Sequence, residues 1–261
     1  MGSPLEQPAA GIVEIALPPL DALLAELAAL AQKSEAIMRY LDAVRADAFT
    51  HPDGRRDPLD GMGLTEPAAA LLSHLARHSP TPLSVEIGFG MGMSTSVILG
   101  TRRACGRRIQ HYAFDPFGLP QNRGAVVEDY LNEQFKGRFL RVRERSEIGL
   151  GTLLKQHGRH SAGLIFIDGD HRFEHIIADF VLADLLCCPG GFIVFDDSWF
   201  PAIETAVNYI AANRPDYAVH HLPVNNLSFI QKIDTRDRRT WSAFKPFPVP
   251  QREDWTSVLD G

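Results

Sequence analysis

Three closely spaced glycines follow a short apolar run in the first half of the chain. Residues 85–95 read Val-Glu-Ile-Gly-Phe-Gly-Met-Gly-Met-Ser-Thr. The alternating apolar residues of 83–87 predict a strand, and the residues from Ser94 onward predict a helix that starts at once. A strand that turns through glycines into a helix brings backbone N–H groups and a helix N-terminus against a ligand. The segment therefore predicts a binding turn for a nucleotide-like ligand.

The spacing of these glycines differs from that of a dinucleotide site. The dinucleotide fingerprint is Gly-x-Gly-x-x-Gly, and Met93 stands where its third glycine is required. Glu86 places a carboxylate at the end of the strand, where it would repel a pyrophosphate. A carboxylate at that point suits a cationic ligand that carries an amino-acid group. An NAD-dependent oxidoreductase is therefore disfavoured.

The next predicted strand ends in an acidic residue, Asp115. It follows Gly88 by 27 residues, near the separation of about 20 at which an acidic residue accepts the ribose hydroxyls in nucleoside-binding sheets. Pro116 leaves a second interpretation open, in which Asp115 caps the loop that follows. Ribose binding is the interpretation that this spacing favours.

Acidic residues also close two later predicted strands. The first ends in Asp168-Gly169-Asp170-His171, and the second ends in Asp196-Asp197. If these strand ends meet, their carboxylates repel one another unless solvent, a proton or a cation relieves the repulsion. A hard divalent cation such as Mg²⁺ prefers oxygen ligands and leaves positions for substrate oxygens. Two simpler roles stay open: Asp170 and His171 capping the next helix, and Asp196-Asp197 forming a polar rim without metal.

A parallel sheet is needed to bring these strand ends together. Apolar runs predict strands at 83–87, 108–114, 139–144, 162–168, 191–195, 218–221 and 227–232. Helical patterns lie between them, at 94–102, 124–135, 148–156, 173–186 and 202–213. The alternation predicts an α/β fold: a Rossmann-like, doubly wound, mostly parallel seven-stranded sheet whose last two strands form an antiparallel edge hairpin. Ligands of such sheets bind at the carboxyl ends of the strands.

The residues before the sheet divide into an arm, helices and a loop. Residues 1–19 predict an extended arm, 20–45 predict one or two amphipathic helices, and 51–63 predict a loop. A further helix is expected from its N-cap Thr65 to about Arg77. We expect 1–63 to form an N-terminal helical cap or a contact between copies, 64–235 to form the ligand-binding domain, and 236–261 to form a tail.

The pattern from about Thr65 to Ile233 resembles the class I S-adenosylmethionine-dependent methyltransferases. Residues 86–92, Glu-x-Gly-x-Gly-x-Gly, resemble motif I of that class. Asp168, Asp196 and Asp197 match the strand-end metal ligands of the metal-dependent small-molecule O-methyltransferases, which include the catechol O-methyltransferase type and related antibiotic-tailoring enzymes. The run 168–171 is similar to one that a broad bacterial subfamily carries. The resemblance implies S-adenosyl-L-methionine as cofactor, and Mg²⁺ or another divalent cation held by Asp168, Asp196 and Asp197.

The resemblance also implies roles for single residues. Asp168 and His171 are the implied catalytic residues, because catechol-type enzymes carry a lysine base where His171 stands. A histidine accepts a proton near neutral pH, and this departure disfavours a catechol acceptor. Ser146 and Glu147 occupy the position near the adenine, with capping of the next helix as the alternative. The implied cofactor-binding residues are Glu86, Gly88, Phe89, Gly90, Gly92, Ser94, Thr95, Asp115, Pro116, Ser146, Glu147 and Asp168.

Composition limits the partners. The net charge of −6 over 261 residues disfavours nucleic acid, and the arginines at 102, 103, 107 and 108 are expected at a solvated helix end. Three cysteines give neither a disulfide framework nor a metal-binding spacing, and no apolar run reaches membrane-spanning length. A cytoplasmic protein without membrane contact is expected. On the helix at 173–186, His175, Asp179 and Asp184 are expected to be surface or capping residues.

The expected function is transfer of a methyl group from S-adenosylmethionine to a hydroxyl of a small-molecule acceptor. Two alternatives stay open at this point. One is a metal-independent N- or O-methyltransferase, and the other is a non-catalytic protein that binds the cofactor through the same fold. The N-terminal helices are a candidate contact for a homo-oligomer. The sequence does not identify the acceptor.

Overall fold

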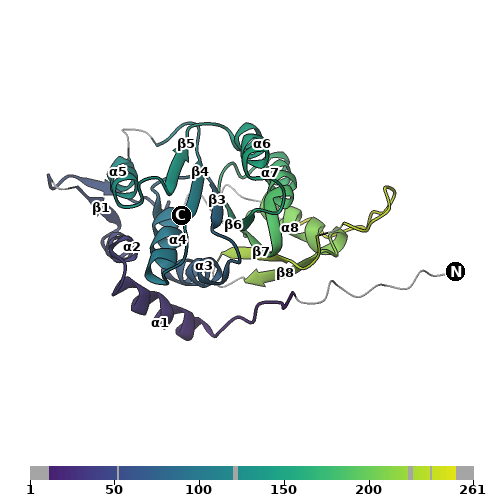
Figure 1. The fold of residues 1–261 in the computed structure, drawn as a ribbon, viewed down its shortest axis with the longest axis horizontal. Coiled ribbons are helices and arrows are strands. Elements are labelled where there is room, and N and C mark those ends of the chain that lie inside the picture. The colour runs from purple at the N-terminus through teal and green to yellow at the C-terminus, as the bar shows by residue number, and fades with distance from the viewer. Residues whose placement is uncertain (1–11, 52, 120–122, 223–225, 236, 251–261) are drawn as a thin grey trace.

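A seven-stranded sheet forms the centre of the molecule (Figure 1). The computed structural model describes residues 12–51, 53–119, 123–222, 226–235 and 237–250. The strands lie in the order β5-β4-β3-β6-β7-β9-β8, and β9 runs antiparallel to both of its neighbours. The predicted doubly wound sheet with an antiparallel edge hairpin is therefore confirmed. Its strands are β3 Leu83–Ile87, β4 Gln110–Phe114, β5 Phe139–Val142, β6 Ala162–Ile167, β7 Cys187–Phe195, β8 Tyr217–Leu222 and β9 Leu227–Lys232.

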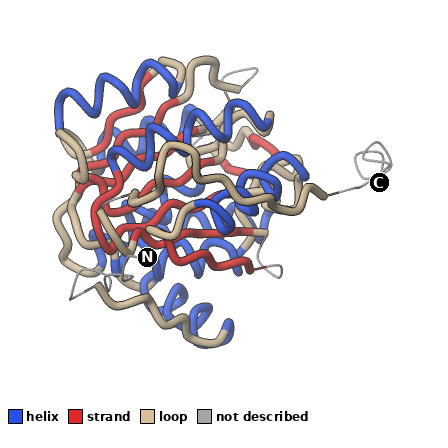
Figure 2. The backbone as a smooth tube through the Cα atoms, turned by 90° about the vertical axis from the view of Figure 1, so that its right-hand side faces the viewer, coloured by secondary structure: helices blue, strands red, loops and turns tan. Residues whose placement is uncertain are grey.

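Helices cover both faces of the sheet, which is why its strands are almost wholly apolar. The core on one face is built from α1 to α5, and the core on the other from α6 to α8. Figure 2 shows the strands enclosed between these layers. In the described part of the chain, the helices are too short or too polar to cross a membrane. They are α1 Leu20–Ala31, α2 Glu35–Ala46, α3 Glu66–His78, α4 Met93–Ala104, α5 Ala125–Gln134, α6 Ser146–His157, α7 Phe173–Leu186 and α8 Pro201–Asn213.

Two elements differ from the sequence prediction. Residues 51–63 were expected to be a loop, but β2 (Arg56–Pro58) lies within them and pairs antiparallel with β1 (Ala48–Thr50). Strands of three residues are too short for an apolar alternation to show in the sequence. The strand expected at 191–195 begins at Cys187, because Cys187 is buried and pairs with Ala162 of β6.

The N-terminal helices belong to the core of the domain. Leu27 of α1 and Ile37 of α2 are fully buried in the cluster that covers one sheet face. Helix α2 lies so close to α4 that a Cβ on Gly100 would come within 2.7 Å of the Ile37 side chain. The small residue at 100 therefore sets the distance between the two helices. Helices α1 and α2 thus belong to the helical layer that covers this face of the sheet.

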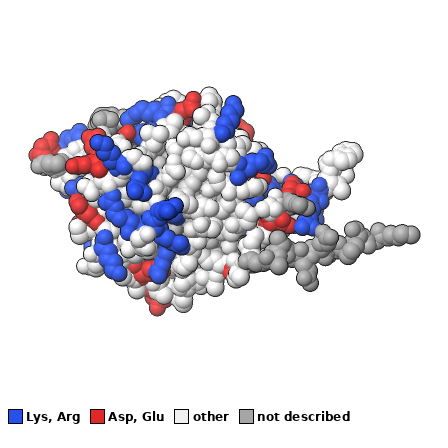
Figure 3. All heavy atoms as spheres, viewed as in Figure 1, with Lys and Arg blue, Asp and Glu red and all other residues white. Residues whose placement is uncertain are grey.

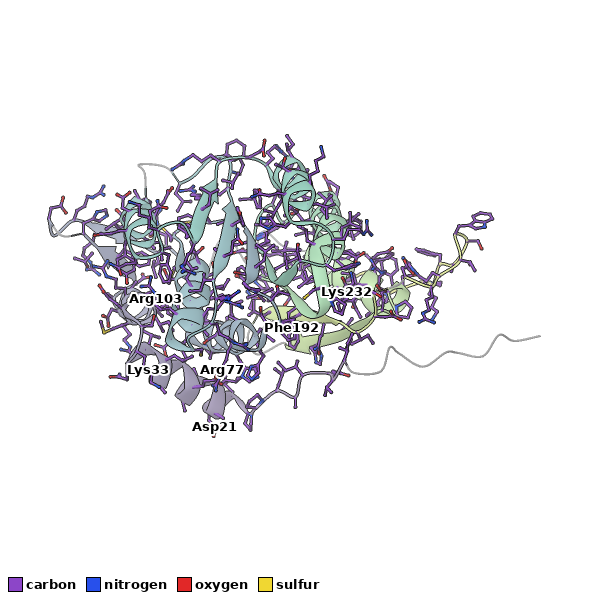
Figure 4. All side chains as sticks on the ribbon, viewed as in Figure 1. Asp21, Lys33, Arg77, Arg103, Phe192 and Lys232 are labelled. Atoms are coloured by element: carbon purple, nitrogen blue, oxygen red, sulfur yellow. The ribbon has the colours of Figure 1, made fainter. Side chains whose placement is uncertain are left out.

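Basic side chains gather on the face that Figure 3 shows, over α1, α3 and α4. Lys33, Arg77 and Arg103 lie there (Figure 4). Arg102, which was expected in the same solvated cluster, is instead buried, and its guanidinium donates to the Ser79 hydroxyl at 2.7 Å. That expectation was wrong for Arg102. Backbone carbonyls of neighbouring segments surround its guanidinium, and the charge pattern alone does not show which of the four arginines is surrounded in this way.

The back of the sheet is held by buried ion pairs. Asp184, expected at the surface or in a cap, accepts from Lys232 of β9 at 2.8 Å and from the Tyr217 hydroxyl at 2.7 Å. Arg214 forms a third contact with it at 2.9 Å. Figure 4 labels Lys232 at this position. The last described segment, 237–250, packs on α8, where Lys245 and Asn213 exchange two backbone–amide hydrogen bonds.

Candidate active site

A cavity of about 920 Å³ opens at the carboxyl ends of β3, β4, β6 and β7. This is the edge at which ligands of parallel α/β sheets bind. Twelve of the predicted site residues line it: Gly88, Phe89, Gly90, Ser94, Asp115, Pro116, Ser146, Glu147, Asp168, His171, Asp196 and Asp197. Among the described residues, Glu86, Gly92 and Thr95 are predicted site residues that do not line it. The sheet therefore brings most of the predicted residues to one place.

The glycine turn is shaped by contact between two strands. Gly88 has φ +89°, and a Cβ on it would lie 1.9 Å from the carbonyl oxygen of Asp168. Its N–H donates to Phe114 of β4 at 2.8 Å, and the Asp168 N–H donates to Ile87 at 2.8 Å. A side chain at 88 would therefore separate the ends of β3 and β6. The absence of a Cβ lets the predicted binding turn approach the backbone of Asp168 at the end of β6.

Glu86 lies behind the cavity wall, which differs from the expectation that it faces the ligand. Its carboxylate is fully buried and accepts hydrogen bonds from the hydroxyls of Ser94 and Thr95. The His111 ring lies 3.1 Å from the same carboxylate. These contacts tie the end of β3 to the first turn of α4. Glu86 and Thr95 thus hold the wall on which Gly88 and Ser94 face the cavity.

Asp115 is held rigidly at the end of β4. The Gly90 N–H donates to its carboxylate at 3.2 Å, and the N–H groups of Phe117 and Gly118 donate at 3.2 and 3.0 Å. Arg141 of β5 forms an ion pair with it at 3.2 Å. Burial favours the neutral acid, but these N–H groups and the guanidinium hold the pKa of Asp115 below its ordinary value. The carboxylate caps its own loop, as the second interpretation of the sequence had it, and also lines the cavity.

The acidic strand ends meet around His171. The His171 Nε2 atom lies 3.7 Å from an Asp168 oxygen and 3.5 Å from an Asp197 oxygen. One ligand atom from each of these three residues lies within 4.8 Å of the others. The Asp196 carboxylate accepts from the Asp197 N–H at 2.9 Å. The closest group of metal-binding type therefore consists of Asp168, His171 and Asp197, where the sequence predicted Asp168, Asp196 and Asp197.

Burial and neighbouring charge raise the pKa of two carboxyl groups in this cluster, Asp168 and Asp196. The Asp168 side chain is 34% exposed and lines the cavity. Burial raises its pKa to about 6, and Asp197 adds to the effect while His171 opposes it. Burial and the charges of Asp168 and Asp197 hold the pKa of Asp196 well above its ordinary value. The nearby Asp168 carboxylate raises the pKa of His171. Ionisation of Asp168 and Asp196 is therefore less favourable than ionisation of a free aspartate.

Ser146, Glu147 and Asp179 form another part of the wall. Ser146 starts α6 at the end of β5, and Asp179 comes from α7. The expectation that Asp179 and His175 are surface or capping residues was wrong: Asp179 is 2% exposed, and both side chains line the cavity. Apolar residues are spread around most of α7, so the sequence does not show which face of this helix is turned inward.

Residues outside the predicted motifs complete the wall. The loop between β2 and α3 contributes Gly61, Met62, Gly63 and Leu64. From the hairpin between β8 and β9, Asn226 donates to the Asp197 carboxylate at 2.7 Å, and the Trp199 ring N–H donates to the same oxygen at 3.1 Å. The position of Trp199, two residues beyond the acidic pair, was a usable signal. Nothing local in the sequence ties Asn226 or Met62 to this site.

Comparison with known proteins identifies the central domain. A family model described as a methyltransferase domain matches residues 85–198. Uncharacterized protein R132 of Acanthamoeba polyphaga mimivirus is 44% identical over 54 residues, which are 19% of this chain and 24% of that protein. The chain thus spans about a quarter of the curated relative that it matches.

Solved structures share the fold at low sequence identity. The SAH-bound methyltransferase PaMTH1 of Podospora anserina is 17% identical, with a TM-score of 0.55 over 85% of this chain and 100% of that one. Cofactor-bound Rv0187 from MTB is 17% identical, with a TM-score of 0.58 over 84% and 100%. A Staphylococcus aureus protein proposed to be a caffeoyl-CoA O-methyltransferase is 14% identical, with a TM-score of 0.54 over 81% and 100%. Residues 85–198 thus match a methyltransferase domain, and the chain shares its fold with these solved structures.

Proposed function

We propose that this chain transfers the methyl group of S-adenosylmethionine to a hydroxyl oxygen of a small molecule. The observation that carries the proposal is the meeting of a glycine turn, Asp115 and the acidic cluster around His171 in one cavity. In the reaction, an oxygen lone pair attacks the methyl carbon while the bond from that carbon to sulfur breaks. The hydroxyl proton goes to a base of the protein, and S-adenosylhomocysteine leaves.

The cofactor would lie along the turn between β3 and α4. Asp115 would accept the two ribose hydroxyls, since its carboxylate already lines the cavity in ionised form. Backbone N–H groups near Gly88 and Gly90 would bind the amino-acid end. Ser146 and Glu147 stand where the adenine would lie. Alignment of donor and acceptor by such contacts supplies a large part of the rate enhancement in two-substrate reactions.

The donor set around His171 fits a hard divalent cation. Asp168 and Asp197 offer oxygens close to each other, and Asp196 would complete the set and leave His171 available as a base. The raised pKa values of Asp168 and Asp196 indicate that the cluster lacks compensating positive charge. Mg²⁺, when bound, would lower the pKa of the acceptor hydroxyl as a Lewis acid. The protein residues would hold the acceptor oxygen beside His171.

His171 would act as the general base in this arrangement. Its ring packs against Phe200 with centroids 5.0 Å apart, which fixes its orientation. To accept a proton it must be neutral, and the Asp168 charge raises its pKa and so opposes that state. Compensation of the carboxylates by a cation would restore the neutral imidazole.

The acceptor side of the cavity is apolar. Met62, Leu64, Phe117, Leu119 and Trp199 line it. Met62 and Phe117 remain 43% and 82% exposed, so both offer apolar surface to a ligand. The volume of about 920 Å³ is near the top of the range of about 300–1,000 Å³ for small-molecule sites. These features favour a small acceptor with an apolar or aromatic face, bound next to the cofactor.

A metal-independent transfer is the second candidate, and one observation favours it. The His171 Nε2 atom lies within 3.7 Å of both Asp168 and Asp197, so a protonated ring would by itself compensate part of their charge. In that case the acidic residues would orient the acceptor by hydrogen bonds. Methyl transfer that continues in EDTA would favour this candidate.

The test is calorimetry of S-adenosylhomocysteine binding, with and without Mg²⁺, on the wild type, Asp196→Ala and Asp21→Ala. Asp21 lies exposed on α1 and serves as the control (Figure 4). We expect wild type and control to bind the cofactor product, and Mg²⁺ to bind both but to bind Asp196→Ala weakly. Failure of the wild type to bind S-adenosylhomocysteine would refute the methyltransferase proposal. Equal behaviour of all three proteins toward Mg²⁺ would refute only the cation.

A further inference from the structure

A second cavity, of about 380 Å³, lies between α1, α3 and the end of α4. Its volume falls within the range of about 300–1,000 Å³ for small-molecule sites. The basic residues Lys33, Arg77 and Arg107 line it, and Glu26 is the one acidic residue among its described lining residues. Because α3 leads into β3 and α4 leads into β4, the cavity lies at the amino ends of these strands. It is therefore at the opposite edge of the sheet from the proposed active site.

This second cavity carries positive charge that no carboxylate balances. The Glu26 carboxylate is already engaged, because it pairs with Arg77 at 2.5 Å and lies 3.1 Å from the His74 ring. Arg107 donates to the backbone carbonyl of Arg77 at 2.7 Å, which is a neutral acceptor. Lys33 is exposed, and its ammonium group has no partner in the described part of the chain. The charges of Lys33 and Arg107 are therefore available to an anion.

Arg102 gives independent evidence of positive potential at this edge. Its buried guanidinium donates to neutral groups, among them the Ser79 hydroxyl at 2.7 Å. The arginines at 102, 103, 107 and 108 form no ion pair with a carboxylate among the residues that the structure describes. Burial and the charge of Arg107 lower the pKa of Arg102 to about 10. An anion bound beside Arg107 would reduce the cost of burying this second cation.

Helix ends explain only part of this basic cluster. The carboxyl ends of α1, α3 and α4 lie at the cavity, and such ends attract cations by themselves. Arg102 and Arg107 serve the end of α3, since they donate to the carbonyls of Ala76 and Arg77. Lys33 follows α1 but donates to no carbonyl in the described part of the chain. Its ammonium group, beside the cavity, is thus not explained by helix capping.

We propose that this second cavity binds the phosphate group of a small molecule. Guanidinium and ammonium groups both bind phosphate oxygens, and a phosphate offers more charge and more acceptor oxygens than a carboxylate does. Lys33 would contact it from the end of α1, and Arg107 from the connection between α4 and β4. The site goes beyond the proposed methyl transfer and does not rest on it, because the two cavities share no described lining residue.

The experiment is calorimetric titration of the full chain with inorganic phosphate in EDTA, at an ionic strength held constant with sodium chloride. EDTA removes divalent cations, so the acidic cluster at the other edge of the sheet repels the probe. We expect saturable binding to the wild type, at least about fivefold tighter than binding of acetate. In Lys33→Gln the affinity for phosphate should fall at least about tenfold, because a charged hydrogen bond is lost. Arg108→Gln is the matched control: Arg108 is exposed and follows Arg107 but does not line the cavity, so the affinity should stay within about twofold.

Three results would overturn the proposal. The first is a wild type that does not bind phosphate saturably. The second is a loss in Lys33→Gln no greater than the loss in Arg108→Gln, because a general attraction to positive charge would then account for the binding. The third is acetate that binds as tightly as phosphate, which would contradict the class of ligand. Lys33 is exposed and its ammonium group has no described partner, so the variant is expected to fold, and the wild-type titrations need no variant.

Discussion

The space around Gly88 predicts how one added methyl group would affect stability and binding. Gly88→Ala would place a Cβ 1.9 Å from the Asp168 carbonyl oxygen and 2.7 Å from the carbonyl carbon. Both atoms belong to the backbone at the end of a buried strand, so no side-chain rotation relieves the contact. Real Cβ atoms essentially never come closer than 3.0 Å to such atoms. The ends of β3 and β6 must therefore separate by about 1 Å.

The magnitude follows from two contributions. A residue with φ +89° costs about 1–2 kcal/mol when it acquires a side chain, and forced displacement in a packed region costs a further 1–3 kcal/mol, roughly. Gly88→Ala should therefore lower the free energy of unfolding by about 2–5 kcal/mol. Gly90→Ala is the matched control, because Gly90 also has positive φ but a Cβ on it would meet nothing within 4 Å. That variant should lose only about 1 kcal/mol.

The measurement is urea unfolding of both variants, followed by S-adenosylhomocysteine calorimetry under conditions in which each is folded. A displacement of about 1 Å at Asp168 should weaken binding in Gly88→Ala at least tenfold, since small misplacements in such sites have large effects. Equal destabilisation of the two variants would contradict the reasoning, because positive φ would then account for everything. A stable Gly88→Ala variant with normal binding would refute the described contact.

Three further predictions concern buried charge. Burial raises the pKa of Asp179 to about 6, so the folded state binds the proton of this group more tightly than the unfolded state does. Ionisation of Asp179 therefore destabilises the fold above pH 6, and this destabilisation disappears below about pH 4. Asp179→Asn should therefore be more stable than the wild type at pH 8 by up to about 3 kcal/mol, with no difference at pH 4, as chemical denaturation at the two pH values would show. Glu86→Ala leaves three buried donors without an acceptor and should cost about 3–5 kcal/mol by the same assay, whereas a loss below 1 kcal/mol would contradict the described network. Saturating Mg²⁺, a hundredfold above its Kd, should add about 2.7 kcal/mol to the stability of the wild type but not to that of Asp197→Ala, and equal thermal shifts in both would exclude the acidic cluster as the binding site.

The residues at the strand ends could be predicted because the rule that places them depends only on their neighbours in sequence. A parallel sheet places every strand's carboxyl end at one edge, so any residue that closes an apolar run is placed without long-range knowledge. Asp115, Asp168 and Asp196 follow from that rule, and all three line the cavity. Glu86 stands one residue inside β3 rather than at its end. Side chains of a strand alternate between faces, so one position decides whether a carboxylate meets the ligand or the helix behind it.

Residues on helices could not be placed in the same way. Helix α7 is apolar around most of its circumference, so periodicity does not distinguish the face toward the cavity from the face toward the sheet. Asp179 then looks like any polar helix residue, although it is almost completely buried. Arg102 was misplaced for a related reason. Its carbonyl partners include Ala76 of α3 and Thr81 of the loop after it, 26 and 21 residues earlier in sequence, and Arg108 six residues later. Backbone acceptors cannot be recognised from residue types.

The arrangement around Asp197 shows how the protein controls its acidic cluster. Trp199 and Asn226 both donate to one oxygen of Asp197, so that oxygen is satisfied by neutral donors. The other oxygen is the one that lies 3.5 Å from His171. The two donors thus fix the carboxylate so that its other oxygen faces His171. Asn226 comes from the antiparallel hairpin, which contributes none of the predicted motifs. The edge hairpin therefore orients a carboxylate supplied by the parallel part of the sheet, and in the proposed reaction this orientation would set the geometry of the acidic cluster.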